Sequence, residues 1–486
     1  MGSSVKAAIP ALLSAILLGL AFPPLPTFLL VFVAIVPWLQ SLRAPDCRPL
    51  RSGALFGAIF MGSQMFWLVI FVGKWTGSTG LAMLPWVIAT GLLIPFFMLL
   101  GWLIHQCYKL NAPWAIPLVW AGVEVLRSTL PGAAFPHAIV AIPLYVVPEI
   151  IQHASIGTMF FVSASVVLVN VVLLEVAERA PIRRTIVMAS ITAGVFMYSV
   201  YRHAEPQGGD TKTLVIGQLG TDLAFGDPST EDMRVGEAVS EIAAKADSWN
   251  ADLLILPEGL GVASGDSLPQ VPFSMPATPV IFGTQRRSEH VYQSAYAFDG
   301  TLQSVDKTHL VVFGEYVPFR DSLPFLKSFN LPSGDLVPGD KVGLLKPSGI
   351  PVGVSICFET LFYDVAATQA DMGARLLATI SIDDWYAGSG MNQNLLAGTV
   401  YRAVENGLPM ARAASLGESA LIDSRGNMLA RAPFGKRFAL RTTVKLPEKT
   451  DAFAYRSAFP IIAMLTCVGV AIASFASKRK KSAPSK

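Results

Sequence analysis

Long apolar segments in the first two hundred residues constrain the fold of this chain more than any other feature. A membrane-spanning helix needs about 20 mostly apolar residues, because lipid offers the backbone no hydrogen-bond partners. Such segments are predicted at residues 7–21, 25–42, 53–73, 81–104, 113–130, 155–175, 185–201 and 457–477. We therefore expect a membrane domain of seven transmembrane helices over residues 1–205, an extramembrane domain over 206–452, and a last transmembrane helix with a basic tail over 453–486.

The first apolar segment has an alternative interpretation as a signal peptide, since Lys6 precedes it. It carries no convincing small-residue cleavage site, and further apolar segments follow at once. These features favour a helix that stays in the membrane.

The basic residues predict the orientation of these helices, because lysine and arginine gather in cytoplasmic loops. They lie in alternate connections and after the last helix: Arg43, Arg48, Arg51, Lys109, Arg179, Arg183, Arg184 and residues 478–481. The opposite connections carry few of them, with Lys74 as the exception. We expect both termini in the cytoplasm and residues 206–452 in the periplasm, on the inner membrane of a bacterium.

Composition excludes some partners. Charged residues make up 15% of the 486 residues, against about a quarter in ordinary soluble proteins. The net charge is only +3, and no basic patch is interleaved with aromatic residues. Nucleic acid is therefore not expected as a binding partner. Of the four cysteines (Cys47, Cys107, Cys357 and Cys467), three lie in or beside apolar segments, so no disulfide framework is expected.

The extramembrane domain has the pattern of an α/β fold. Short, continuously apolar runs at 213–218, 251–258, 279–283 and 376–381 are typical of strands covered on both faces. Residues 231–249 have apolar positions at helical spacing. The pattern predicts a layered sandwich of sheets and helices.

Cys357 is the strongest candidate for chemistry, because it ends a β-branched run and Glu359 follows closely. A lone thiol beside a carboxylate is typical of an acyl-transfer nucleophile, although a buried structural cysteine fits the same pattern. Glu258 ends another apolar run, and Lys307 precedes a loop that carries Glu315. A carboxylate can take the thiol proton and a lysine can stabilise an oxyanion. The alternatives are a helix-start acid for Glu258, a surface charge for Lys307 and a loop ion pair for Glu315.

Taken together, the order Glu258, Lys307, Cys357 resembles the nitrilase superfamily of carbon–nitrogen hydrolases. The matching motifs are Leu256-Pro257-Glu258, Asp306-Lys307-Thr308-His309-Leu310, Ile356-Cys357-Phe358-Glu359 and Tyr401-Arg402-Ala403-Val404-Glu405-Asn406. The resemblance implies a four-layer α-β-β-α sandwich, with Glu258, Lys307 and Cys357 as the catalytic residues.

The flanking membrane helices narrow the resemblance to the apolipoprotein N-acyltransferase family. Further matches are Ala21-Phe22-Pro23-Pro24, Trp120, Glu124, Arg127, Phe135-Pro136 and the loop 311–319. The family implies that an acyl chain moves from a membrane phospholipid, through a cysteine thioester, to the N-terminal amine of a diacylglyceryl-cysteine lipoprotein. It implies no cofactor, and the sequence has no metal-ligand spacing or phosphate-binding glycine loop. We expect a monomer.

The resemblance also implies roles for residues around the catalytic three. Glu315, Glu359 and Phe358 are expected to support them, and Tyr316, Trp385 and Phe225 to contact substrate. Apolar residues of the following loop are expected to form a lid at the membrane interface, with ordinary loop packing as the alternative: Phe319, Phe325, Leu326 and Phe329.

The chain departs from the family pattern near the expected cleft. Phe358 stands where tyrosine is usual, and the loop 223–226 lacks a tryptophan. A segment that commonly reads Ser-Asn-Asp-Ala-Trp-Phe-Gly here reads Ser381-Ile382-Asp383-Asp384-Trp385-Tyr386-Ala387. Two alternatives therefore stay open: a membrane enzyme of the conjugal-transfer TraB type with a different exported protein acceptor, and a non-catalytic membrane scaffold.

Overall fold

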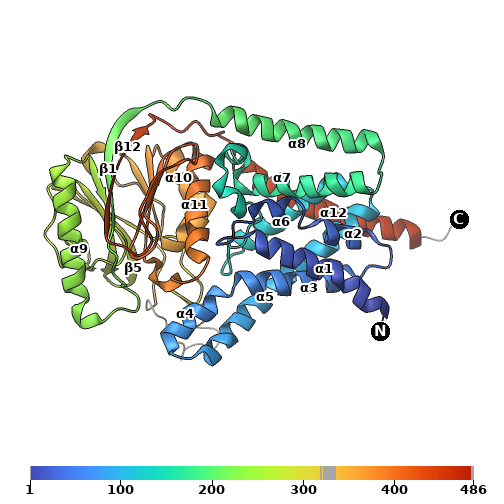
Figure 1. Ribbon diagram of the computed structural model, residues 1–486, viewed down its shortest axis with the longest axis horizontal. Coiled ribbons are helices and arrows are strands. Elements are labelled where there is room, and N and C mark those ends of the chain that lie inside the picture. Colours follow the sequence, from blue (N-terminus) through green and yellow to red (C-terminus); the bar gives the residue numbers. More distant parts are fainter. Residues whose placement is uncertain (1, 318–319, 321–334, 483–486) are drawn as a thin grey trace. The chain divides into compact units, whose positions relative to one another are not determined.

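The computed structural model describes residues 2–317, 320 and 335–482 (Figure 1). Its internal contacts divide the chain into two units, Met1–Ala204 with Phe453–Lys486, and Glu205–Ala452. The predicted lid residues Phe319, Phe325, Leu326 and Phe329 lie outside the described residues.

The first unit is helical (Figure 1). Its elements are α1 (Gly2–Ala21), η1 (Phe28–Phe32), α2 (Val36–Arg43), α3 (Pro49–Gln64), α4 (Trp67–Thr76), α5 (Thr79–Lys109), η2 (Pro113–Ala115), α6 (Ile116–Thr129), η3 (Ile142–Val146), η4 (Pro148–Ile150), α7 (Ala154–Ala177), α8 (Ile182–His203) and α12 (Ala458–Ser482), where η marks a short 3-10 helix.

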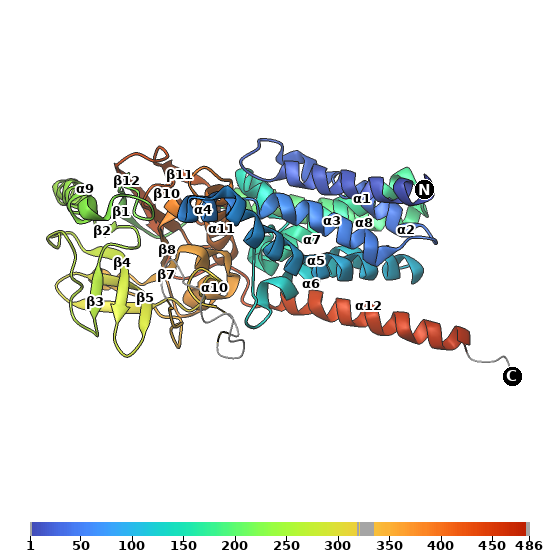
Figure 2. The same cartoon turned by 90° about the horizontal axis from the view of Figure 1, so that it is seen from below.

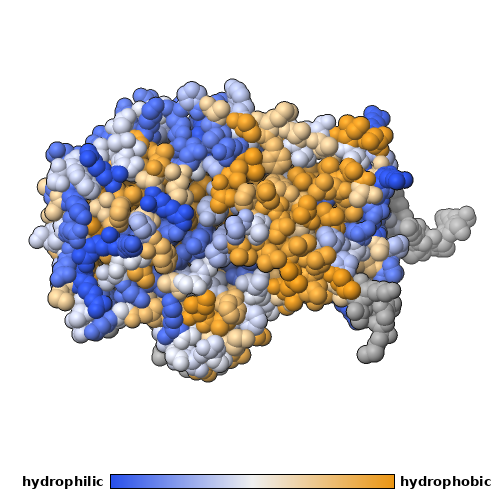
Figure 3. Space-filling model, in the orientation of Figure 1, coloured by the Kyte–Doolittle hydropathy of each residue, from blue (hydrophilic) through white to orange (hydrophobic). Residues whose placement is uncertain are grey.

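Within the described residues, three helices are long and apolar enough to cross a membrane: Thr79–Lys109, Ala154–Ala177 and Ala458–Ser477. A fourth span results if α3 and α4, which bend by 50° at their junction, are counted together. On the face shown in Figure 3, apolar residues cover much of the helical unit. Exposed apolar surface of this extent is typical of contact with lipid. The total of seven helices before residue 205 stays a prediction.

The predicted helix at 25–42 is divided into η1 and α2. Asn170 of α7 occupies the break, where its side-chain oxygen accepts from Ile35 N at 3.0 Å and its amide donates to Val31 O at 3.0 Å. An interrupted helix is tolerated at membrane depth when protein groups satisfy the freed backbone atoms. Apolar character alone could not reveal this partner from a distant helix.

Small residues let α3 and α5 pack closely. A Cβ atom at Gly53 would lie 2.2 Å from the carbonyl oxygen of Phe97, a distance that no side chain tolerates. Beside this contact, Trp38 stacks on Phe56 with 4.1 Å between ring centroids. Close backbone approach at small residues is the usual packing mode of membrane helices.

In the described part of the second unit, strands form two sheets. The first has the order β12-β1-β2-β4-β5-β6, with β3 also paired to β4, and the second has the order β11-β10-β9-β8-β7. The strands are β1 (Asp210–Gln218), β2 (Leu253–Ile255), β3 (Val262–Ser264), β4 (Val280–Arg287), β5 (Val291–Phe298), β6 (Leu302–Asp306), β7 (Val352–Ile356), β8 (Leu376–Ser381), β9 (Met410–Ala414), β10 (Ala420–Ile422), β11 (Met428–Arg431) and β12 (Phe438–Leu446). The helices are α9 (Pro228–Ser248), η6 (Pro347–Gly349), η7 (Cys357–Leu361), α10 (Tyr363–Asp371), η8 (Asp383–Tyr386) and α11 (Met391–Asn406).

The two sheets face each other, and helices cover their outer faces. Strands β1, β4 and β5 contact β9, β8 and β7, while α9 packs on the first sheet and α10 and α11 on the second. Figures 1 and 2 show the strands between α9 and α11. Side chains of α9 such as Val239 and Ile242 pack in one core with Val215 and Leu254. This arrangement confirms the predicted four-layer α-β-β-α sandwich.

The predicted strands are also confirmed, since 213–218, 279–283 and 376–381 lie within or overlap β1, β4 and β8. Parallel strands β7 and β8 are in register with Ile356 opposite Ile380. Both strands therefore end at the same edge, which places Cys357 beside Ser381. The candidate catalytic side chains lie near this edge.

Candidate active site

Cys357 follows β7 directly and begins the short helix η7. Its backbone φ is +55°, in the left-handed region that residues other than glycine rarely adopt. Its side chain is buried and hydrogen-bonds to the side chain of Ser381. Backbone strain of this kind persists where surrounding contacts over-determine a conformation, often at functional sites.

Glu359 holds this strained turn in place. One of its carboxylate oxygens, Oε2, accepts a hydrogen bond from Ile356 N at 3.0 Å. The other, Oε1, accepts from Thr308 N and Thr308 Oγ1, both at 2.8 Å, and from His309 N at 3.2 Å. Glu359 therefore ties the Cys357 turn to the segment that follows Lys307. These four bonds all come from donors of the protein itself, as expected for the predicted supporting role.

Glu258 lies after β2, in a segment locked to β4. Leu256 N donates to Ile281 O at 2.8 Å, and Gly283 N donates to Pro257 O at 3.0 Å. A Cβ atom at Gly283 would lie 2.8 Å from Glu258 Cα, so this close approach requires glycine. The buried carboxylate accepts from Ile382 N at 3.2 Å. Glu258 is thereby fixed between the end of β2 in the first sheet and Ile382, which follows β8 in the second sheet.

Lys307 is a buried cation paired with Glu315. The ammonium Nζ lies 2.7 Å from Glu315 Oε1, and the lysine side chain has no exposed surface. The second oxygen of Glu315 accepts from Val311 N at 2.9 Å. The interpretation of Lys307 as a surface charge is therefore wrong. The ion pair of Glu315 is internal to the site and positions the lysine.

The three predicted catalytic side chains change one another's proton affinity, which shows that they share one site. Burial raises the pKa of Glu258 to about 7; Lys307 opposes the rise, and the charge of Glu315 adds to it. Burial lowers the pKa of Lys307, but Glu315, Cys357 and Glu258 more than offset this, and the net shift is upward. The lysine therefore carries its charge at neutral pH.

The thiol of Cys357 is kept protonated in the resting site. Burial raises its pKa to about 12, with Glu258 adding to the rise and Lys307 opposing it. Oxidation of a cysteine follows its thiolate character, so the resting thiol is protected. Nucleophilic attack needs a base that removes the proton, and Glu258, with a pKa of about 7, is available for this at neutral pH.

A series of buried polar side chains begins at Ser381, the hydrogen-bond partner of Cys357. The sequence did not predict it. Ser381 Oγ donates to Asp383 Oδ1 at 2.7 Å, and Arg412 Nη2 donates to Asp383 Oδ2 at 2.5 Å. Both charged side chains are almost fully buried. The sequence contained the acid but gave no sign of its partner, because Arg412 comes from β9, one strand further along the sheet.

Tyr386 is a second residue that sequence reasoning did not assign to the site. It is buried at the end of η8. Its pKa lies well above 10, first because of burial and then because of the charges of Cys357, Glu315, Asp383 and Glu258. Phe358, predicted to support the site, is buried in η7 and lies edge-on to Phe362 with 6.2 Å between centroids.

Two of the predicted substrate-contacting residues lie together. Phe225 and Trp385 make an edge-to-face contact with 5.4 Å between ring centroids, and both rings are partly exposed. Asp384 holds the loop that carries Phe225, since its Oδ2 accepts from Leu223 N at 2.7 Å and its Oδ1 from Ser415 Oγ at 2.8 Å. Tyr316 is partly buried next to Glu315, and its carbonyl accepts from Phe313 N at 2.8 Å.

Metal chemistry has no ready ligand set in the part of the chain that the structure describes. No group of three or more His, Cys, Asp or Glu side chains is placed there to hold a metal ion. The site instead offers a thiol, a carboxylate with a raised pKa and a buried ammonium. Such a set can form and break an acyl–sulfur bond with proton transfer to and from the carboxylate.

Comparisons with known proteins match both units of the chain. The model of the apolipoprotein N-acyltransferase N-terminal domain matches residues 14–172, and that of carbon–nitrogen hydrolases matches residues 277–448. An apolipoprotein N-acyltransferase from Geobacter metallireducens is 28% identical over 97% of this chain and 95% of that protein. The chain is thus similar to apolipoprotein N-acyltransferases along nearly its full length, which confirms the resemblance predicted from its motifs.

Further apolipoprotein N-acyltransferases show a similar likeness. One from Haemophilus influenzae is 26% identical over 87% of this chain and 86% of that protein. Among solved structures, Saccharomyces cerevisiae Nit3, a nitrilase-superfamily member, aligns with a TM-score of 0.37 and 16% identity over 49% of this chain and 93% of that one.

Proposed function

We propose that this protein moves an acyl chain from a membrane phospholipid to the N-terminal amine of a diacylglyceryl-cysteine lipoprotein, through a thioester on Cys357. The observation that carries the proposal is the buried cluster of Glu258, Lys307 and Cys357, in which a carboxylate with a pKa of about 7 accompanies a protonated thiol. The relatives that match nearly the full chain bear the name apolipoprotein N-acyltransferase.

In the first half-reaction, Glu258 takes the proton of Cys357 and the sulfur attacks the ester carbonyl of the phospholipid. The developing oxyanion is stabilised by the Lys307 ammonium and by the backbone N–H that follows Cys357. When the tetrahedral intermediate collapses, the carbon–oxygen bond breaks and the leaving alkoxide takes the proton from Glu258. Lysophospholipid departs, and the acyl group stays on the sulfur.

In the second half-reaction, the acceptor amine attacks the thioester carbonyl and Glu258 takes a proton from the attacking nitrogen. Collapse breaks the carbon–sulfur bond, and the proton returns to the sulfur. An amide is formed, and Cys357 is again a thiol. Glu315 keeps Lys307 in place through both steps, since it provides the ammonium's buried counter-charge.

The family consists of bacterial membrane enzymes, and this chain has helices apolar enough to span a bilayer. We further propose that the catalytic unit faces the periplasm and that both termini are cytoplasmic. The alternating distribution of basic residues along the sequence supports this orientation. Cysteines introduced at exposed sites of each connection, labelled from one side of intact membranes, would test it.

The acyl-enzyme is the direct test of the proposed chemistry. Purified full-length protein is incubated with phosphatidylethanolamine, and its intact mass is measured before and after hydroxylamine treatment. We expect one hydroxylamine-sensitive acyl adduct on the wild type and on Cys47→Ala, and none on Cys357→Ala. A diacylated lipopeptide should then remove the adduct and gain the acyl chain. Absence of any adduct from the wild type would overturn the proposal.

A further inference from the structure

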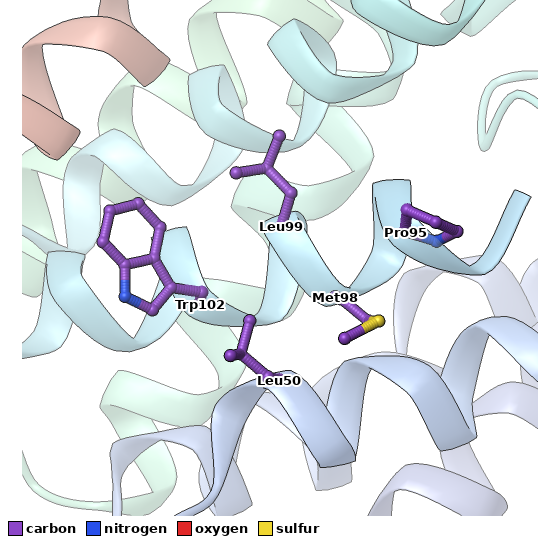
Figure 4. A pocket seen from close by; sticks show the side chains of 5 residues that line it. All are labelled: Leu50, Pro95, Met98, Leu99 and Trp102. Carbon is purple, nitrogen blue, oxygen red and sulfur yellow. The ribbon is translucent and has the colours of Figure 1, made fainter.

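Two hollows in the described part of the helical unit differ in their chemistry. One, of about 360 Å³, is lined by apolar side chains of α3 and α5: Leu50, Pro95, Met98, Leu99 and Trp102 (Figure 4). The other, of about 280 Å³, has a polar lining that includes Arg43, Tyr108, Lys109, Asn111, Glu175 and Arg184. The second hollow lies outside the catalytic unit, and the proposed reaction does not use it.

The polar hollow has an excess of positive charge. Arg43, Lys109 and Arg184 line it, against the single carboxylate of Glu175. Arg184 is ion-paired to Glu175 Oε2, while Arg43 Nη1 lies 3.8 Å from Glu175 Oε1, too far for a hydrogen bond. The one carboxylate is thus largely taken by Arg184, and the positive charge of Arg43 and Lys109 is left without an equal counter-charge in the lining.

Three donor atoms in this lining are buried and have no hydrogen-bond partner in the protein. They are Arg43 Nη1, Arg184 Nε and the hydroxyl of Tyr108. A buried donor without an acceptor is unfavourable, so such atoms are rare unless a bound group satisfies them. Side chains that supply donors and positive charge call for a ligand with several acceptor oxygens and negative charge. A phosphate group meets both requirements.

The position of the hollow points to lipid. Helix α2 ends at Arg43, α5 ends at Lys109, α7 ends at Ala177 and α8 begins at Ile182. The hollow is therefore at the ends of apolar helices, where the orientation proposed above places lipid head groups. Basic pockets between membrane helices are known to hold the head groups of anionic lipids.

We propose that this hollow is a binding site for a phosphate group, supplied by an anionic phospholipid head group or by free phosphate. Its ligand contacts are the guanidinium groups of Arg43 and Arg184, the Lys109 ammonium and the Tyr108 hydroxyl. All of its lining residues belong to the helical unit, and none belongs to the catalytic unit Glu205–Ala452.

The test uses full-length protein in detergent and native mass spectrometry with added phosphatidylglycerol. The double variant Arg43→Gln/Lys109→Gln removes two cations of the hollow. The control Arg51→Gln/Arg183→Gln removes two exposed arginines that do not line it. We expect about thirty-fold weaker phosphatidylglycerol binding by the first variant and unchanged binding by the control.

A second arm distinguishes the two sources of phosphate. If excess inorganic phosphate leaves phosphatidylglycerol bound, lipid is the ligand; if it displaces the lipid and itself binds with the same dependence on Arg43 and Lys109, free phosphate is. The single variant Lys109→Gln, at an exposed side chain, guards against loss of folding in the double variant and should weaken binding several-fold. Equal binding by the wild type and both double variants, or no binding of either probe, would overturn the proposal.

Discussion

Lys307 and Glu315 form an ion pair with 2.7 Å between Nζ and Oε1, in which the lysine side chain is completely buried. A buried charge is tolerated only when a partner compensates it, so the two residues form one unit. In the proposed mechanism, Lys307 stabilises the oxyanion, and Glu315 does not contact it. The glutamate serves to keep that charge inside the protein.

The ion pair leads to a prediction about stability and activity. Glu315→Gln leaves the ammonium of Lys307 buried without its counter-charge and should cost about 3–5 kcal/mol of unfolding free energy. The double variant Lys307→Met/Glu315→Gln removes both charges and should regain most of that stability, but it should not transfer acyl groups, because the ammonium of Lys307 is gone. Denaturant unfolding in detergent and acyl-enzyme formation measure the two effects. A double variant no more stable than Glu315→Gln would contradict the buried-pair interpretation.

The raised pKa of Glu258 predicts the pH dependence of the first half-reaction. Its carboxylate acts as a base only when deprotonated, and its pKa is about 7. The rate of acyl-enzyme formation should therefore be constant above pH 8 and fall roughly tenfold per pH unit well below pH 7. Single-turnover rates between pH 5 and 9 provide the measurement. A rate that does not change with pH across this range would show that Glu258 is not the base.

A variant of Glu315 provides a further test of this pH dependence, because the negative charge of Glu315 contributes to the raised pKa of Glu258. Glu315→Gln should therefore move the inflection to lower pH, in addition to lowering the rate. Glu241→Gln, which removes a surface carboxylate paired with Lys245, should leave the inflection where it is.

The hydroxyl of Tyr386 is predicted to contribute to turnover. Its ring is buried, and the charges of Cys357 and Glu258 act on its hydroxyl. Phe358 has no hydroxyl, so Tyr386 can supply one to the same cluster. Tyr386→Phe should lower the acylation rate about tenfold with little loss of stability. Tyr363→Phe, outside the cluster, is the matched control. Equal acylation rates for the two variants would show that the Tyr386 hydroxyl does not contribute to turnover and that the residue serves only in packing.

Asp384 is predicted to hold the loop that carries Phe225. Asp384→Ala removes the acceptor of Leu223 N, so amide hydrogen exchange in residues 219–226 should become about tenfold faster. Asp384→Asn keeps an acceptor oxygen and should protect this amide much as the wild type does. Mass spectrometry of proteolytic peptides measures the exchange. Unchanged exchange in Asp384→Ala would mean that other contacts hold the loop, and Phe225 would then be independent of Asp384.

Elements with a clear local pattern could be predicted from the sequence. The apolar run at 213–218 lies in β1, and Cys357 follows β7 directly, because residue spacing and β-branched side chains determine these strands locally. The segment 25–42 could not be predicted as well. Its interruption depends on Asn170, which lies 135 residues from Ile35 in sequence.

In the candidate site, too, local features could be predicted from the sequence, and contacts between distant residues could not. The motifs around Glu258, Lys307 and Cys357 are visible as short stretches of sequence, and their chemistry follows from residue type. The sequence could not reveal that Glu359 binds Thr308, 51 residues away, or that Arg412 pairs with Asp383, 29 residues away. Nor could it reveal that Tyr386 lies in the cluster.

By itself, the sequence determined which segments suit lipid, which form strands, and which side chains have the right chemistry for acyl transfer. Only the tertiary structure decided the proton affinities of those side chains and the strained turn at Cys357. The physical reason is that burial and neighbouring charge, contributed by residues distant in the chain, control whether a thiol, a carboxylate or an ammonium is charged. The same packing leaves donors of Arg43, Arg184 and Tyr108 without partners around one hollow.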